Sequence, residues 1–282
     1  MNGLLLVDKP AGPTSHDVVA QVRRALGTRA VGHAGTLDPF ATGLLVVLVG
    51  RATRLARYLA VLPKVYRATA VLGARTDTDD ATGEVLAGNR GPLPASREVV
   101  AAVLESLVGA RLQRPPAYSA KKVAGVRSYR LARRGAAIDL APVEVVVHEA
   151  DLLEWKPPAL TFRVSVGSGT YVRALARDLG ETLGCGAHLS ALRREAIGAM
   201  RVEEAVALDD ITAAALGPMT RAVAHLPLVP LDPDAVRAVG HGRAVPSPGS
   251  LEGSVALVAD GELLAVGRAD GDWLRPEVVL GP

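Results

Sequence analysis

An uninterrupted run of six apolar residues, Leu44–Val49, follows a glycine-rich loop and limits what this chain can fold into. The run is far shorter than the ~20 residues that a membrane-spanning helix needs. It offers no polar position that could face water, so it predicts a buried strand. A buried strand requires a large core, and 49% of the 282 residues are apolar whereas only 22% are charged. These proportions exclude a chain that is disordered over most of its length.

Strand and helix patterns are mixed through the first 225 residues and indicate an α+β fold. A helix with an apolar stripe is expected to begin with Ser15 as its N-cap and to end at Gly27. The other expected strands are Gly3–Val7, Tyr66–Leu72, Val143–Leu153 and Leu160–Val166, and the other expected helices are Thr53–Ala60, 97–107 and 172–183.

The segment 226–282 differs in composition from the rest of the chain. Pro227, Pro230 and Pro233 give it a linker-like beginning. Short strands are then expected, with Gly-Asp turns between them. They are Val255–Val258, Leu263–Gly267 and Glu277–Leu280. We therefore predict two domains, 1–225 and 226–282, of which the second is a small β domain.

Positive charge is concentrated in one part of the chain, although the formal net charge is only +3. Between Ser106 and Ile138, which we call the basic window, there are eight basic residues and no acidic one, so the rest carries −5. The eight are Arg111, Arg114, Lys121, Lys122, Arg127, Arg130, Arg133 and Arg134. Such a window is typical of a contact with a polyanion, although an exposed helix and loop would show the same pattern. Pro115-Pro116 and Tyr118 favour a nucleic-acid clamp.

The loop Gly32–Gly43 has the composition of a ligand-binding loop. Its three glycines allow tight turns or a close approach to a ligand. Asp38 lies between Leu37 and the Pro39-Phe40 pair, just before the buried strand, so its carboxylate should be partly desolvated and need a cationic partner. On these residues alone, a simple Asx-type turn at Asp38-Pro39 is an equally physical interpretation and the commoner one.

Other motifs that could bind a cofactor or a metal ion are incomplete. The segment 77–83 resembles a calcium loop, but Ala81 and Thr82 stand where a carboxylate or amide and a glycine are needed. Gly167-Ser168-Gly169 lacks the third glycine of a dinucleotide fingerprint. The single cysteine, Cys185, excludes an intramolecular disulfide and a multi-cysteine zinc site. We therefore expect no cofactor and no metal. Low cysteine use and the lack of a signal-type apolar run predict a cytoplasmic protein that does not enter membranes.

Several short segments, taken together, carry a resemblance to a known family. They are Gly3–Pro10 with Gly32–Gly43, Lys64–Arg67, Arg75–Asp80, Pro115–Lys122, Gly169–Arg173 and Gly184–Leu189. In this order they resemble the TruB-type bacterial tRNA pseudouridine-55 synthases, and the resemblance covers almost the whole chain. It implies a mixed β-sheet core flanked by helices, the pseudouridine-synthase fold, with a small C-terminal β-barrel-like PUA domain.

The resemblance also implies a reaction and its catalytic residues. Uridine 55 in the T-loop of tRNA would be isomerised to pseudouridine without cofactor or metal. Asp38 matches the family's nucleophilic aspartate, whose target, sugar or base, stays open. Arg173 matches the arginine that pairs with this carboxylate and keeps it charged. Tyr66 matches the tyrosine that stacks on the base and takes part in proton transfer, and Tyr171 matches a second aromatic ring of the pocket.

Substrate binding is implied for a further set of residues, because the target uridine must be flipped out of the T-loop. His33 matches the histidine that fills the vacated space. Lys9 matches a lysine that supports the active-site loop, Asp80 an RNA-contacting acid, and Leu192 an apolar pocket residue. A thumb loop at about 111–135 would close over the T-arm stem-loop. Its contact residues would be Tyr118, Lys121, Lys122, Arg127 and Arg130. The expected partner is tRNA, and the expected oligomeric state is a monomer.

Two other function classes are compatible with the same residues. A glycosidase-like hydrolase would use Asp38 with a second acid, Asp80 or Glu84, and would release free base from RNA. A catalytically silent RNA-binding protein or tRNA chaperone would bind RNA without forming a product.

Overall fold

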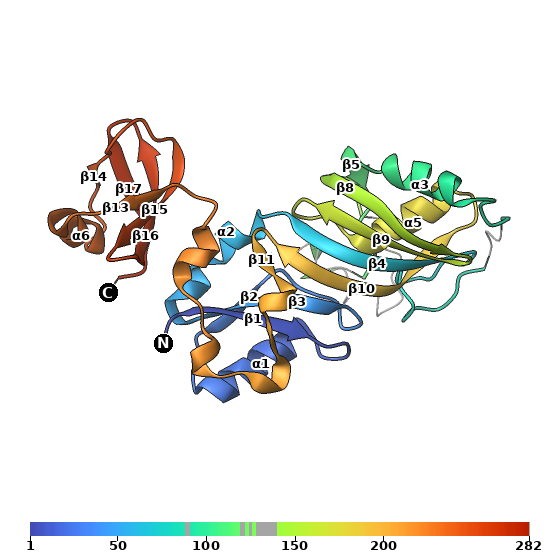
Figure 1. The fold of residues 1–282 in the computed structure, drawn as a ribbon, viewed down its shortest axis with the longest axis horizontal. Coiled ribbons are helices and arrows are strands. Elements are labelled where there is room, and N and C mark those ends of the chain that lie inside the picture. Colours follow the sequence, from blue (N-terminus) through green and yellow to red (C-terminus); the bar gives the residue numbers. More distant parts are fainter. Residues whose placement is uncertain (88–90, 119–121, 124–125, 128–139, 282) are drawn as a thin grey trace. The chain divides into compact units, whose positions relative to one another are not determined.

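The computed structural model describes the chain except for residues 88–90, 119–121, 124–125, 128–139 and 282 (Figure 1). The chain forms two compact units that are each discontinuous in sequence. The first unit comprises Met1–Asp38, Leu44–Val61 and Val202–Pro282, and the second comprises Pro39–Gly43 and Leu62–Arg201.

The first unit has a sheet in which the buried apolar run is an inner strand. Its strands are β1 (Gly3–Lys9), β2 (Val31–Ala34), β3 (Thr42–Val49) and β12 (Val206–Ala207). β1 lies between β12 and β3, and β2 pairs antiparallel with β3. Every residue of Leu44–Val49 is fully buried, which confirms the expectation of a buried strand. Four short 3-10 helices lie between residues 202 and 223: Val202–Glu204, Leu208–Asp210, Ala213–Ala215 and Met219–Val223.

The N-cap of helix α1 (Ser15–Leu26) lies one residue before the position expected from the sequence. The N-cap is Thr14, not Ser15, and Thr14 forms a capping box with Asp17. Gly27, at φ 62°, ends the helix in the left-handed conformation, as expected. The expectation for Ser15 was wrong because its hydroxyl bonds a distant segment instead, the main chain of Leu37.

The expected helix Thr53–Ala60 is shorter and starts differently. A 3-10 helix, η1 (Gly50–Leu55), comes first, and α2 (Ala56–Ala60) continues from it. Arg51, Arg54 and Arg57 are spaced three apart along this segment, so they share one side of it.

The second unit is built on an antiparallel sheet that carries helices α3 and α5. Its strands, in spatial order, are β10 (Ala187–Ile197), β4 (Lys64–Leu72), β9 (Ala159–Val166), β8 (Val143–Lys156) and β5 (Gly109–Gln113). Helix α5 (Val172–Thr182) packs on β10, and α3 (Arg97–Glu105) packs on β8 (Figure 1). Short strands β6 (Lys122–Val123) and β7 (Val126–Arg127) form a hairpin, and β11 (Met200–Arg201) pairs with β10.

The start of β3 also belongs to the second unit, where Thr42 and Gly43 pair in parallel with β10. A Cβ on Gly43 would lie 2.3 Å from the carbonyl oxygen of Arg194. Only glycine permits this approach, and its φ of 99° also favours glycine. The last glycine of the Gly32–Gly43 loop is therefore needed for the contact between strands.

The C-terminal segment forms its own five-stranded sheet around an apolar core. Its order is β13 (Leu228–Pro230), β15 (Gly253–Ala259), β16 (Glu262–Asp270), β17 (Trp273–Val279) and β14 (Val245–Pro246). The three expected strands are confirmed. A helix, α6 (Pro233–Gly240), occupies part of the segment expected to be a linker. Asp232 caps it, and Pro233 is tolerated because the first helical residue needs no N–H donor.

Side chains of η1 and α2 hold the last strand of this C-terminal sheet. Arg51 Nη1 donates to the carbonyls of Leu280 and Gly281, at 2.7 and 2.8 Å. Arg54 donates to the carbonyl of Val279, and Arg57 forms an ion pair with Glu277 at 3.0 Å. Within the first unit, the C-terminal sheet is thus fastened to the η1–α2 segment mainly through main-chain carbonyls. None of the helices described is long and apolar enough to cross a membrane.

Candidate active site

Asp38 lies in the loop between β2 and β3, half-buried, directly after a residue that is fixed in place. The Ser15 hydroxyl donates to the Leu37 carbonyl at 3.1 Å and accepts from the Leu37 N–H at 2.9 Å. Leu37 itself is buried. The first residue of α1 therefore holds the backbone next to the Asp38 carboxylate, which limits the motion of that carboxylate.

Two more predicted residues of the first unit have defined surroundings. Lys9 is fully buried, and its Nζ donates to the carbonyls of Pro10 and Pro13 at 2.8 and 2.9 Å. It thereby holds the loop that leads into α1. The ring of His33, on β2, contacts that of His16 edge-on, with centroids 5.4 Å apart.

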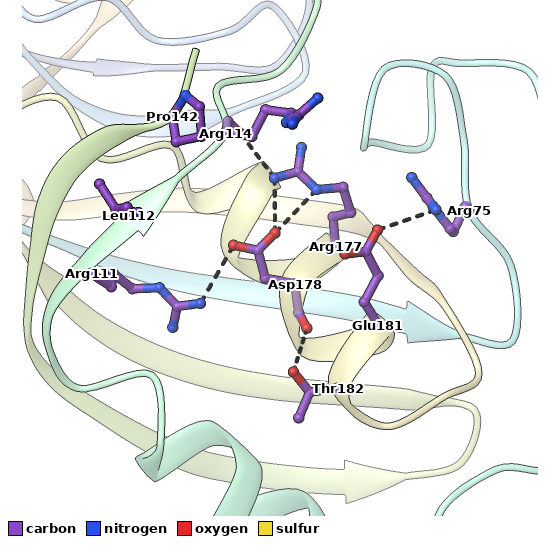
Figure 2. A pocket seen from close by; sticks show the side chains of 9 residues that line it. All are labelled: Arg75, Arg111, Leu112, Arg114, Pro142, Arg177, Asp178, Glu181 and Thr182. Atoms are coloured by element: carbon purple, nitrogen blue, oxygen red, sulfur yellow. Dashed lines mark hydrogen bonds and ion pairs between the residues drawn. The ribbon is translucent and has the colours of Figure 1, made fainter. Parts of the chain in front are cut away.

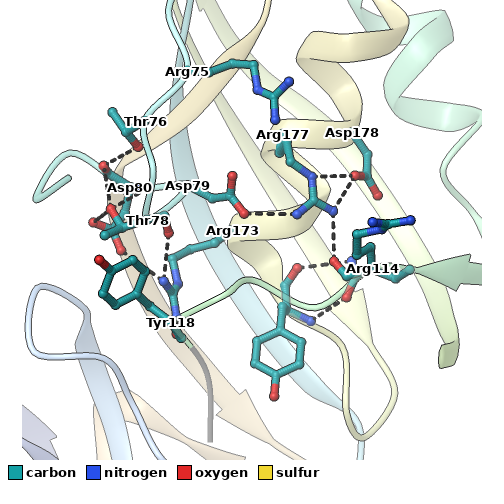
Figure 3. A network of polar contacts seen from close by, with 12 residues as sticks. Arg75, Thr76, Thr78, Asp79, Asp80, Arg114, Tyr118, Arg173, Arg177 and Asp178 are labelled. Carbon is teal, nitrogen blue, oxygen red and sulfur yellow. Dashed lines mark hydrogen bonds and ion pairs between the residues drawn. The ribbon is translucent and has the colours of Figure 1, made fainter. Parts of the chain in front are cut away.

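Arg173, near the start of α5, is a buried cation with a fully organised guanidinium (Figure 3). Its Nη1 lies 3.3 Å from Asp80 Oδ2 and donates to the Thr78 carbonyl at 2.8 Å. Its Nη2 donates to the Tyr118 carbonyl at 2.9 Å. The side chains of Arg173 and Asp80 are each only 5% exposed. Acceptors from two separate segments therefore fix the plane of the guanidinium.

Asp80 is held as a hydrogen-bond acceptor by a tight turn. Its Oδ1 accepts from the Thr78 hydroxyl at 2.8 Å, and from the Thr82 N–H and hydroxyl at 2.9 and 2.5 Å. The Asp80 carbonyl accepts from the Thr76 hydroxyl at 2.7 Å. A carboxylate whose oxygens meet this many donors is committed to the turn and to Arg173 rather than to a reacting group. Residues 77–83 form a turn instead of a calcium loop, and the buried acid of this turn, Asp80, pairs with Arg173.

Tyr66 and Leu192 share one face of the sheet in the second unit. In the antiparallel register of β4 and β10, Tyr66 lies opposite Arg194, and Leu192 lies opposite Ala68. Alternate residues of a strand point to the same face, so these four side chains are neighbours. Tyr66 is 9% and Leu192 7% exposed. The register thus brings together two residues that the sequence implicated separately.

Tyr171 is the N-cap residue of α5 and is half-buried. Its main chain is bound twice by the amide of Gln113, a fully buried residue at the end of β5. Tyr171 N–H donates to Gln113 Oε1 at 2.9 Å, and Gln113 Nε2 donates to the Tyr171 carbonyl at 3.2 Å. Gln113 orients the helix that carries Arg173. No motif in the sequence marked it.

Lys64 is another residue that sequence reasoning missed. It lies two residues before Tyr66 on β4, is 9% exposed, and donates from Nζ to the Leu62 carbonyl at 2.7 Å. Burial and the positive charge of Arg194 lower the pKa of Lys64 to about 8. Lys64 lies in one of the segments that resemble the TruB-type family. The sequence signal that could have singled it out is a lysine at the start of a largely apolar strand.

The residues of the basic window are described in part. Tyr118 is half-buried, and its hydroxyl lies 3.5 Å from Asp77 Oδ2. Lys122 and Arg127 are paired across the β6–β7 hairpin. Lys121 and Arg130 lie outside the described residues.

The predicted site residues fall into two groups. Lys9, His33 and Asp38 belong to the first unit, whereas Tyr66, Asp80, Tyr118, Tyr171, Arg173 and Leu192 belong to the second. The pairing of Arg173 with Asp38 stays a prediction, and within the second unit the Arg173 guanidinium pairs with the carboxylate of Asp80.

Comparison with known proteins decides the family. Residues 23–172 match the model of the TruB family pseudouridylate synthase N-terminal domain, and 173–226 match that of the tRNA pseudouridylate synthase B C-terminal domain. The chain belongs to the TruB family. Its TruB relatives named "tRNA pseudouridine synthase B" include one from Thermobifida fusca, 48% identical over 99% of this chain and 98% of the relative. Another, from Gloeobacter violaceus, is 43% identical over 99% of both.

The TruB fold is also present in solved structures. An H/ACA RNP bound to a substrate RNA containing 2'-deoxyuridine includes a chain that is 30% identical, with a TM-score of 0.77 over 99% of this chain and 85% of that one. A Cbf5–Nop10–Gar1 complex gives 30% identity and a TM-score of 0.75 over the same shares. The expected α+β pseudouridine-synthase fold is therefore confirmed.

Proposed function

We propose that this chain isomerises uridine 55 in the T-loop of tRNAs to pseudouridine. The observation that carries the proposal is its 48% identity, over nearly the full length of both chains, to a relative named tRNA pseudouridine synthase B. The buried, three-acceptor guanidinium of Arg173 supports it, because such a cation can hold a reacting carboxylate ionised away from water.

The reaction is an isomerisation, so every atom of the uridine is kept. The bond between the sugar C1' and N1 of uracil breaks, the base turns, and a C1'–C5 bond forms. The proton on C5 leaves, and N1 gains one. In this proposal Asp38 attacks the sugar or the base, and Arg173 stabilises its charge. The nearly buried Tyr66 stacks on the uracil, and its hydroxyl takes part in moving the C5 proton.

Binding of the T-arm is assigned to groups of both units. His33 takes the place of the flipped base, and the basic window binds backbone phosphates. Leu192, on the same strand face as Tyr66, supplies an apolar pocket wall. The C-terminal sheet acts as a PUA-like RNA-binding domain. We further propose that the protein acts as a monomer in the cytoplasm, without metal or cofactor, because an isomerisation of this kind requires none.

The hydrolase alternative is disfavoured by the second acid that it needs. Asp80 accepts hydrogen bonds from two threonines and pairs with Arg173. Glu84 is exposed on the outgoing side of the same turn. A glycosidase acid requires a carboxyl that is kept protonated in a dry pocket.

The test is incubation of the protein with an unmodified T-arm hairpin, followed by carbodiimide and primer-extension detection of pseudouridine. A stop is expected at the target uridine and none on a hairpin with cytidine there. Free uracil in the supernatant would identify a hydrolase instead. Tight binding without product would identify an RNA-binding protein or chaperone.

A further inference from the structure

Arg177 lies one turn of α5 beyond Arg173 and repeats its pattern of contacts (Figure 3). Arg173 binds the carboxylate of Asp80 and the carbonyl of Tyr118. Arg177 binds the carboxylate of Asp79 at 3.0 Å and the carbonyl of Arg114 at 2.8 Å. Residues four apart share a helix face, so the two arginines connect the same three segments side by side. These segments are α5, the 77–80 turn and residues 114–118 of the basic window.

The guanidinium of Arg177 is immobilised by further contacts. Its Nε and Nη2 donate to Asp178 Oδ1 at 3.1 and 2.8 Å, and its side chain is 10% exposed. Asp178 Oδ2 lies 3.5 Å from Arg111 Nη2. Because Arg111 belongs to β5 and to the basic window, the same network also holds the strand that leads to Arg114.

The backbone at Asp79 is what allows two consecutive carboxylates to reach one helix. Adjacent residues of an extended segment point to opposite sides. Asp79 has a φ of 60°, in the left-handed region, which only one other non-glycine residue of the described chain shares, Asp260. The turn is also bonded to β10, because Leu189 N–H donates to the Asp79 carbonyl at 3.0 Å.

Fold stability gives little reason for this arrangement. Burial raises the pKa of the Asp79 carboxyl above its usual range, although Arg177, Arg173 and Arg75 act in the opposite direction. The folded protein therefore disfavours ionised Asp79 relative to the unfolded chain, and buried ion pairs often add nothing net. A left-handed backbone at a non-glycine residue costs a further ~1 kcal/mol.

We propose that Asp79 and Arg177 are positioning residues that hold the Arg173 guanidinium and residues 114–118 in the geometry needed for isomerisation. The pair acts through the shared 77–80 turn and the shared 114–118 segment, and it touches no substrate. This inference rests on the proposed function, since the geometry in question is that of Arg173 toward a reacting group. It predicts an effect on the chemical step that exceeds any effect on folding or on RNA binding.

Three variants and one control test the pair. Asp79→Asn keeps the shape and tolerates the left-handed backbone, Asp79→Gly keeps only the backbone, and Arg177→Lys keeps only the charge. Asp260→Gly is the matched control, because Asp260 has the same backbone conformation but is exposed in the C-terminal sheet. Single-turnover isomerisation, hairpin Kd and melting temperature are measured for each.

The three variants are expected to lower the melting temperature, because a buried charge loses its partner, and to slow single-turnover isomerisation by at least about tenfold, with Kd changed less than about threefold, at a temperature where all of them are fully folded. Asp260→Gly is expected to match the wild type in all three. Wild-type rates in the variants, or losses that follow melting temperature or Kd, would overturn the inference. An inactive wild type would instead refute the proposed function, and the inference with it.

Chemical rescue gives a readout that a purely structural role would not move. Arg177 lines a cavity of about 640 Å³, together with the acids Asp178 and Glu181 (Figure 2). In Arg177→Ala these acids would remain and attract a small cation. Added guanidinium ion at low concentration is therefore expected to restore part of the rate of Arg177→Ala, whereas urea is not. Equal rates with guanidinium, with urea and without either would contradict a positioning role.

Discussion

Three buried ionisable groups among the described residues are held by other groups of the chain. Lys9 has two carbonyls, Arg173 has a carboxylate and two carbonyls, and Asp80 has donors from two threonines. Because an ion loses its hydration on burial, such partners are required for it to stay charged. The same partners fix its direction, which is what an electrostatic role in catalysis needs.

The geometry at Arg173 predicts that lysine cannot replace it. A lysine ammonium cannot match the planar fork that now meets Asp80, the Thr78 carbonyl and the Tyr118 carbonyl. We expect Arg173→Lys to lower the rate of isomerisation by about a hundredfold or more, measured in single turnover on the hairpin. Arg163→Lys is the control, because Arg163 also pairs with a carboxylate, that of Glu195, but its side chain is 48% exposed. A near-normal rate for Arg173→Lys would exclude the specific geometry.

The lowered pKa of Lys64 predicts a pH-dependent stability. The folded protein releases the Lys64 proton near pH 8, while the unfolded chain keeps it to about pH 10.4. Between these values the unfolded state binds more protons, so this group makes the free energy of unfolding rise with pH. From pH 8 to pH 10.4, the free energy of unfolding of the wild type should therefore rise relative to that of Lys64→Met, by at most about 3 kcal/mol. Denaturant titrations at pH 7.5 and 10 would measure the difference.

The control for this titration is the exposed Lys156, whose partner is Glu154. The free energy of unfolding of the wild type should not rise with pH relative to that of Lys156→Met. A constant difference between wild type and Lys64→Met at both pH values would show that Lys64 stays protonated in the fold.

Among the helices and strands, local sequence patterns correctly predicted those strands whose formation depends mainly on the burial of apolar side chains. The run Leu44–Val49 is a fully buried strand, and the alternation at Tyr66–Leu72 is part of β4. Local chemistry was ambiguous at helix starts. Ser15 was a suitable cap by type, yet its hydroxyl binds Leu37, 22 residues away, and Pro233 begins a helix rather than a linker.

Contacts between distant segments could not be predicted from spacing. Asp79 and Arg177 are 98 residues apart, and Gln113 and Tyr171 are 58 apart. No local period encodes such pairs, since they depend on how the strands order in the sheet. The individual site residues came from the resemblance. Their partners, such as the carboxylate of Asp80 on Arg173, came only from the fold.

Three arginines, Arg51, Arg54 and Arg57, are expected to attach the C-terminal sheet to the η1–α2 segment. Replacing Arg51, Arg54 and Arg57 together by alanine removes the donors that bind Leu280, Gly281 and Val279 and the partner of Glu277. We expect faster proteolysis between the C-terminal sheet and the rest, and hairpin affinity several-fold weaker, with the rate at saturating hairpin retained. Arg275→Ala, which removes an exposed pair within the sheet, is the control. Unchanged proteolysis and affinity would refute this role.

At the scale of the whole molecule, charge is segregated rather than high. The basic window carries +8 in a chain of net charge +3. If it binds the T-arm, its cations displace counterions from phosphates, and affinity falls with salt by ~0.7–0.9 log units per log unit of salt for each contact. Changing Lys121, Lys122, Arg127 and Arg130 to alanine should remove roughly two to three units of this slope. An unchanged slope would identify the window as an ordinary solvated surface.

The proposed reaction depends on Asp38 as the nucleophile, and one substitution tests this role. Asp38→Asn is nearly isosteric but removes the nucleophilic oxygen. Pseudouridine formed in a single turnover on the T-arm hairpin is measured beside the Kd of the same hairpin, with exposed Asp260→Asn as the control. We expect no detectable product from Asp38→Asn and a Kd within several-fold of that of the wild type. A rate within tenfold of the wild type would contradict it.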